Sequence, residues 1–135
     1  PAYHAHQDDV EIIPGVHETL EELKRTGMEI HIVTAARKDF AEHLIKVADI
    51  AKYCEGFHYH VHDKHAQICA ITNGMEVTLK ECAMVGDLPS DVRAANWAGI
   101  SSIGFMNRHV PRDVFSNVKM DFTAHTFSDL LKFLL

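Results

Sequence analysis

Four polar residues of this sequence have the side chains that phosphate and metal chemistry requires. Thr34, Lys64 and Asp87 each follow a short apolar segment, and Asp91 comes one helical turn after Asp87. A hydroxyl can donate a hydrogen bond to a phosphate oxygen, and an ammonium group can neutralise charge that develops during phosphoryl transfer. A pair of carboxylates can hold a hard cation such as Mg²⁺. These residue types therefore indicate phosphate chemistry assisted by a metal.

The elements that must position these residues alternate between strands and helices. Short β-branched or apolar runs predict strands, and longer runs with helical spacing predict helices. This alternation predicts an α/β fold, a Rossmann-like, doubly wound parallel sheet with right-handed crossovers and helices on both faces. The carboxyl ends of parallel strands meet at one edge, where ligands bind. The predicted strands are 28–33, 57–61, 82–85, 100–105 and 120–124, and the predicted helices are 16–26, 39–52, 65–72, 89–98 and 128–135.

Composition narrows the class of protein. The chain has 135 residues, 47% of them hydrophobic, which suits one compact domain with a single core. A net charge of -6 and the absence of a basic run argue against nucleic acid or a membrane surface as a partner. Three cysteines without Cys-x-x-Cys spacing are typical of reduced thiols, and residues 1–9 are too polar for a secretory signal. We therefore expect a soluble cytoplasmic protein.

Four stretches of the sequence, taken together, resemble a known family. They are Ile13-Pro14-Gly15-Val16 with its continuation to Gly27, Ile30-His31-Ile32-Val33-Thr34, Asp63-Lys64, and Val85-Gly86-Asp87 with its continuation through Asp91 to Gly99. In this order they resemble the haloacid dehalogenase-like superfamily of phosphatases, particularly its phosphoglycolate phosphatase-like members. The resemblance implies a core domain over residues 12–135. Residues 1–11 would be a loop, or a remnant of the segment that follows the nucleophile motif or of a cap module.

The resemblance also implies a mechanism and a set of site residues. By this resemblance we expect a magnesium-dependent phosphatase that acts on a small phosphorylated metabolite through an aspartyl-phosphate intermediate. Thr34 would bind the transferring phosphoryl group, helped by backbone N–H groups near Ala35. Lys64 would neutralise the charge of the phosphate and the nucleophile. Asp87 would hold Mg²⁺, and Asp91 would be either a second ligand or an orienting carboxylate.

One part of the family pattern is missing from this sequence. The nucleophile should be the first aspartate of an Asp-x-Asp-x-Thr/Val motif at the end of the first, central strand, between the strands that end at Thr34 and Asp87. Only Asp8-Asp9 is acidic in this region, and its spacing is wrong. We expect the strand to lie upstream of Pro1, to be replaced by residues 2–6, or to come from another chain. A catalytically inactive domain that binds phosphate or a protein partner is therefore an alternative function.

A histidine-rich segment supports a third function. On a strand, His58, His60 and His62 would share one face, so the cluster from His58 to His65 could seat Zn²⁺ in a zinc hydrolase. An exposed loop explains the same cluster. We expect Trp97 to be a packing residue. No cap module fits between Thr34 and Lys64, so we expect any cap to precede Pro1. Without a cap the site would be open, which suits a bulkier substrate or a homo-oligomer that covers it.

Overall fold

The computed structural model describes residues 14–106, 111 and 113–135. The predicted loop over residues 1–11, the Asp8-Asp9 pair and part of the connection after residue 106 lie outside the described residues. The chain divides into two compact units, Pro1–His62 and Asp63–Leu135, and each is described by itself. Among the described helices, none is both long enough and apolar enough to span a bilayer.

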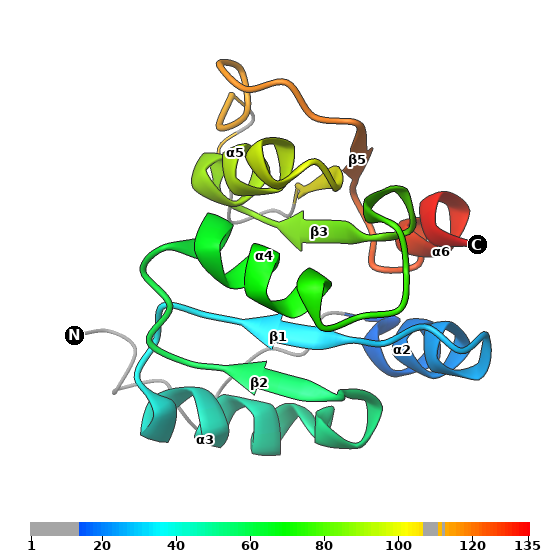
Figure 1. The fold of residues 1–135 in the computed structure, drawn as a ribbon. Coiled ribbons are helices and arrows are strands. Elements are labelled where there is room, and N and C mark those ends of the chain that lie inside the picture. The colour runs from blue at the N-terminus through cyan, green and yellow to red at the C-terminus, as the bar shows by residue number, and fades with distance from the viewer. Residues whose placement is uncertain (1–13, 107–110, 112) are drawn as a thin grey trace. The chain divides into compact units, whose positions relative to one another are not determined.

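The first unit contains a two-stranded parallel sheet. Its elements are α2 (Val16–Arg25), β1 (His31–Val33), α3 (Lys38–Ala48), the 3-10 helix η2 (Ala51–Tyr53) and β2 (Gly56–His58). Strands β1 and β2 lie side by side and run in the same direction (Figure 1). In their register His31 lies opposite Gly56, and Val33 lies opposite His58. The parallel pairing confirms the predicted strand direction.

Both strands of this unit are shorter than predicted, for local reasons. β1 begins only at His31 because the N–H of Ile30 donates to the Glu55 carboxylate at 2.5 Å instead of continuing the ladder. β2 ends at His58, and His60 has a φ of 56°, a left-handed conformation that no strand continues through. α3 ends at Ala48 rather than residue 52, because Asp49 adopts the left-handed region at φ 55°.

The second unit is a three-stranded parallel sheet with helices. Its strands are β3 (Ala83–Gly86), β4 (Ser101–Phe105) and β5 (Phe122–Ala124), in the order β3-β4-β5. Its helices are α4 (Lys64–Asn73), η3 (Leu79–Glu81), α5 (Pro89–Ala98) and α6 (Asp129–Leu134). Glycine ends α5 as predicted, because Gly99 takes a φ of 81° that residues with a Cβ rarely adopt.

Both faces of this second sheet are covered. Successive residues of a strand point to opposite faces, and in β3 Met84 packs with the cluster that includes Ile68 of α4 and Ala95 of α5. Its neighbour Val85 packs with the cluster that includes Leu130 of α6. Helices α4 and α5 therefore cover one face and α6 the other. The predicted α/β class, with helices on both faces of a parallel sheet, is confirmed.

The position of β1 and β3 within their sheets is relevant to the missing strand. Among the described residues, β1 pairs only with β2, and β3 pairs only with β4, so each is an edge strand. These are the two strands that the family resemblance places on either side of the absent one. That a further strand joins them stays a prediction.

Candidate active site

The carboxylate of Asp87 stands exposed at the carboxyl end of β3. Gly86 is the last residue of the strand, Leu88 is the N-cap of α5, and Pro89 is its first residue. A proline suits that first position because the amide it lacks would have no partner in the helix. Asp87 therefore lies between strand and helix without capping the helix, and a capping role does not explain its presence. Its side chain is available to a ligand in solvent.

Asp91, in the first turn of α5, is buried, with 5% of its side chain exposed. Its Oδ2 accepts a hydrogen bond from the N–H of Leu88 at 3.2 Å. Its Oδ1 forms an ion pair with Nζ of Lys64, whose side chain is 18% exposed. Both oxygens of Asp91 thus have protein partners. Of the two predicted roles, the orienting carboxylate fits this arrangement better than the direct metal ligand.

Gly86 makes the approach of Asp91 possible. A Cβ added at Gly86 would lie 2.6 Å from Cγ of Asp91, far inside van der Waals contact. Only glycine therefore lets the carboxylate fold back against the end of β3, where its oxygens meet Leu88 and Lys64.

Lys64 reaches Asp91 from the start of α4. The sequence placed it after a predicted strand and directly before a predicted helix. It is the first residue of that helix, which is capped by Asp63, whose carboxylate accepts from the N–H of Ala66 at 3.0 Å. The cap fixes where α4 begins, and hence where the lysine emerges. Three of the predicted site residues, Lys64, Asp87 and Asp91, therefore belong to the second unit, and two of them are in direct contact.

Thr34 belongs to the first unit, directly after β1. Its N–H donates to the carbonyl of His58 at 3.0 Å and its carbonyl accepts from Val61 at 2.9 Å, so its backbone extends the pairing of the two strands. Its Oγ1 accepts from the N–H of Ala36 at 3.1 Å. Because the hydroxyl oxygen is the acceptor in this contact, the hydroxyl hydrogen can donate to another group. The N-cap of α3 is Arg37, so Thr34 is not a helix cap.

The donor set fits a hard cation only in part. Mg²⁺ prefers oxygen ligands, usually one or two carboxylates with substrate oxygens and water. Asp87 offers such an oxygen, whereas both oxygens of Asp91 have other partners. Within the described ranges, no group of three or more histidine, cysteine, aspartate or glutamate side chains could hold a metal ion. Asp87 is thus the one predicted ligand whose geometry suits direct coordination.

The predicted one-sided row of histidines is not formed. His58 ends β2, and the left-handed conformation at His60 breaks the alternation that would have put His58, His60 and His62 on one face. The rings of His60 and His62 lie 5.9 Å apart at a tilted angle. The prediction of a zinc cluster on one face of a strand was wrong, because the positive φ of His60 breaks the alternation of side chains that the prediction required.

The sequence analysis did not predict two contacts between aromatic rings. The rings of His31 and His58 lie side by side with their centroids 5.4 Å apart, and His65 stacks on Trp97 at 4.5 Å. We predicted Trp97 to be a packing residue, but it is 78% exposed and its ring lies against His65. The His31–His58 contact depends on strand register, which the sequence alone did not provide. The helical spacing of His65 and Trp97 within their own helices likewise gave no sign that the two rings meet.

Comparison with known proteins supports the family that the motifs indicated. A family model described as haloacid dehalogenase-like hydrolase matches residues 2–105. The phosphoglycolate phosphatase of Vibrio parahaemolyticus is 32% identical over 130 residues, which cover 90% of this chain and 55% of that protein. The chain thus spans a little over half the length of this curated relative.

Solved structures show the same fold. A predicted phosphoglycolate phosphatase from Haemophilus somnus superimposes with a TM-score of 0.84 at 22% identity, covering 98% of this chain and 62% of that one. A haloacid dehalogenase-like family hydrolase from Streptococcus pneumoniae gives 0.79 at 19% identity, covering 93% and 60%. The family model spans most of the chain, and it includes Thr34, Lys64, Asp87 and Asp91. The chain belongs to the haloacid dehalogenase-like hydrolase family.

Proposed function

We propose that the protein is a magnesium-dependent phosphatase that hydrolyses a small phosphorylated metabolite through an aspartyl-phosphate intermediate, in the cytoplasm. The observation that carries the proposal is the buried Lys64–Asp91 ion pair beside the exposed Asp87, at the carboxyl end of a parallel strand. Ligands of α/β proteins bind at that end of the sheet. The phosphatase names of the relatives in this family support the same reaction class.

In this proposal each of the three residues has a separate task. Asp87 holds Mg²⁺, which supplies positive charge against the phosphate oxygens. Asp91 does not coordinate the ion; it fixes Lys64 so that the ammonium group faces the reacting phosphate. Because the lysine is held before the substrate arrives, little reorganisation is needed as charge develops in the transition state.

Thr34 and Ala35 would bind the transferring phosphoryl group. The Thr34 hydroxyl oxygen already accepts from Ala36, so its hydrogen is left to donate to a phosphate oxygen. The N–H of Ala36 is used in that turn, which leaves the N–H of Ala35 as the second donor. Two such donors from one turn are a small anion-binding site of the kind that backbone amides form at strand ends.

The nucleophile in this proposal is an aspartate at the end of a central strand, and the 135 residues contain no Asp-x-Asp-x-Thr/Val motif. That observation favours a second candidate function, a domain that binds phosphate without hydrolysing it. Both candidates use Thr34 and Lys64, but only the phosphatase depends on Asp87 for turnover. Asp87 therefore separates the two.

The test is hydrolysis of p-nitrophenyl phosphate by the protein at its full natural length, with and without Mg²⁺. We expect magnesium-dependent turnover in the wild type and a loss of at least 100-fold in Asp87→Asn, because the amide lacks the charge that a hard cation requires. Asp113→Asn is the matched control, since Asp113 is also an exposed aspartate but follows no predicted strand. It should keep wild-type turnover.

Two results would count against the phosphatase. Wild-type protein that binds phosphate but gives no turnover at any magnesium concentration would support the binding function instead. Turnover that persists in Asp87→Asn at the wild-type magnesium dependence would remove Asp87 from the metal site.

A further inference from the structure

The structure brings together two histidines of the first unit that lie 27 positions apart in the sequence. Nδ1 of His31 and Nε2 of His58 are 3.2 Å apart, and the planes of the two rings make an angle of 28°. His31 lies at the start of β1 and His58 at the end of β2, and the register makes them diagonal neighbours. Two imidazole nitrogens therefore converge above one face of this sheet.

Glycine at position 56 leaves the space in which the two nitrogens meet. Gly56 lies directly opposite His31 in the register, on the same face as His58. A Cβ placed there would come within 2.5 Å of Nδ1 of His31 and 3.0 Å of Nε2 of His58. Any other residue would thus push a side chain between the two ligand atoms.

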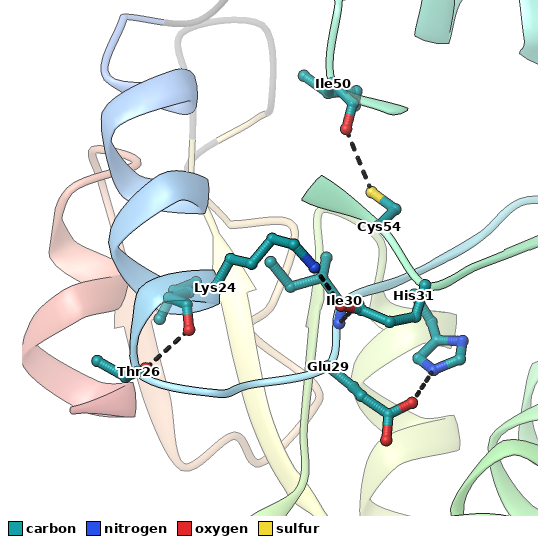
Figure 2. Close-up of polar contacts among 9 residues, drawn as sticks. Lys24, Thr26, Glu29, Ile30, His31, Ile50 and Cys54 are labelled. Carbon is teal, nitrogen blue, oxygen red and sulfur yellow. Dashed lines mark hydrogen bonds and ion pairs between the residues drawn. The ribbon is translucent and has the colours of Figure 1, made fainter. Parts of the chain in front are cut away.

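A carboxylate selects which nitrogen of His31 can act as a ligand. Nε2 of His31 lies 3.3 Å from Oε1 of Glu29, and Figure 2 shows this contact beside the ring. Because a carboxylate only accepts, Nε2 carries the hydrogen and Nδ1 presents its lone pair toward His58. A carboxylate that orients the far nitrogen of a histidine is the usual support of a metal-bound imidazole.

We propose that His31 and His58 form a binding site for a divalent transition metal ion, with Zn²⁺ as the best fit, separate from the magnesium site. Zinc bonds to histidine nitrogen at 2.0–2.1 Å, so two ligands of a tetrahedral ion lie about 3.3 Å apart, close to the separation that the side chains already have. Imidazole suits Zn²⁺, Cu²⁺ or Ni²⁺ and is a poor ligand for Mg²⁺.

The protein supplies two of the four ligands in this site. The described residues form no group of three metal-binding side chains, so water or a small anion completes the coordination. In the metal-free protein, Nε2 of His58 donates its hydrogen to Nδ1 of His31. Coordination by a neutral His58 requires its other tautomer, so Nε2 gives up its proton to solvent while Nδ1 takes one up, and the rings turn about χ2.

The test is calorimetric titration of the chelator-treated protein with ZnCl₂, paired with NMR of the imidazole nitrogens. We expect one site per chain, and shifts confined to the ring nitrogens of His31 and His58, with the largest at Nδ1 of His31 and Nε2 of His58. His31→Ala and His58→Ala should weaken binding at least tenfold. Glu29→Gln should weaken it by about tenfold, the lower end of the effect of orienting partners, because the Glu29 side chain is half exposed.

Gly56→Ala gives the sharpest comparison, because it keeps both ligands and removes the space between them. It should lose zinc binding while its circular dichroism spectrum stays that of the wild type. If Gly56→Ala fails to fold, His58→Ala decides the question. His125→Ala, an exposed histidine of the second unit, is the matched control and should bind as the wild type does.

Two outcomes would overturn the proposal. Equal zinc affinity in wild type, His31→Ala and His58→Ala would assign binding to other histidines. Zinc binding without an NMR shift at Nδ1 of His31 or Nε2 of His58 would mean that the two histidines form only a hydrogen bond. Asp87→Asn should not alter zinc binding, so failure of this site and failure of the phosphatase are distinguished.

Discussion

At the scale of single residues, the contact between Gly86 and Asp91 is the tightest constraint on the site. We predict that Gly86→Ala lowers the free energy of unfolding by about 1–3 kcal/mol, because the added methyl overlaps the Asp91 carboxyl group. Urea denaturation measures the change.

Gly74 offers a matched control for this prediction. It has a φ of -85°, and the nearest atom to an added Cβ is the carbonyl oxygen of Ile71 at 3.5 Å. Gly74→Ala should therefore change stability by no more than about 0.5 kcal/mol. Equal effects at the two glycines would mean that the approach of Asp91 is not what position 86 requires.

The Lys64–Asp91 ion pair gives a second prediction at this scale. Lys64→Ala would leave Asp91, with 5% of its side chain exposed, buried without its cation. Removing one partner of a buried pair costs about 3 kcal/mol or more, which urea denaturation again measures.

The exposed pair of Arg25 with Glu22 serves as the comparison. Solvent screens such pairs, so Arg25→Ala should have a far smaller effect than Lys64→Ala. A loss in Lys64→Ala no larger than that in Arg25→Ala would show that Asp91 is solvated without the lysine.

At the scale of elements, Asp129 begins α6 and ties the preceding turn to it. Its carboxylate accepts from the N–H groups of His125 at 2.9 Å and Thr126 at 3.0 Å. These two backbone hydrogen bonds hold the pKa of Asp129 well below its usual range. A carboxyl with a lowered pKa in the folded state stabilises the fold above its unfolded pKa of about 3.9, and that contribution disappears as the pH falls.

We therefore predict that Asp129→Asn is less stable than the wild type at pH 7, and that the difference shrinks below about pH 4. Thermal unfolding between pH 3 and pH 7 measures it. Asp113→Asn, which removes an exposed carboxylate that accepts no such bonds from the described residues, should follow the wild-type curve. A difference that stayed constant with pH would assign the effect to lost geometry rather than to charge.

The elements also show which predictions sequence patterns can support. The helices began and ended close to the expected residues where a cap or a glycine marked the end, as at Pro89 and Gly99. β1 and β2 were predicted too long, whereas β3 and β4 lie within one residue of the predicted bounds, because apolar runs do not reveal where a side chain such as Glu55 replaces the ladder. The left-handed residues Asp49 and His60 were missed, since neither is a glycine and no local pattern requires the turn.

The predicted site residues were found by residue type and order, and their contacts were found only in the structure. The motif indicated that Asp91 is a ligand or an orienting group, and the hydrogen bond from Leu88 together with Lys64 favours the second. The His31–His58 pair could not be foreseen, because it depends on the register of two strands and on the absence of a side chain at Gly56. Contacts between distant segments are the part that the sequence did not reveal.

At the scale of the whole molecule, the chain is a member of the haloacid dehalogenase-like hydrolase family and divides into two compact units. The second unit contains Lys64, Asp87 and Asp91, and the first contains Thr34. Burial raises the pKa of the Cys54 and Cys82 thiols, so both stay protonated at neutral pH and are poor nucleophiles. The chemistry that we propose therefore depends on oxygen and nitrogen groups rather than on sulfur.

The stacking of Trp97 on His65 has a spectroscopic consequence. Trp97 is the single tryptophan of the chain, and its indole is in contact with an imidazole of α4 while its own backbone belongs to α5. Its fluorescence depends on whether that imidazole remains against it. The emission of the protein is therefore an optical reporter of the α4–α5 contact alone, in the helix pair that also carries Lys64 and Asp91.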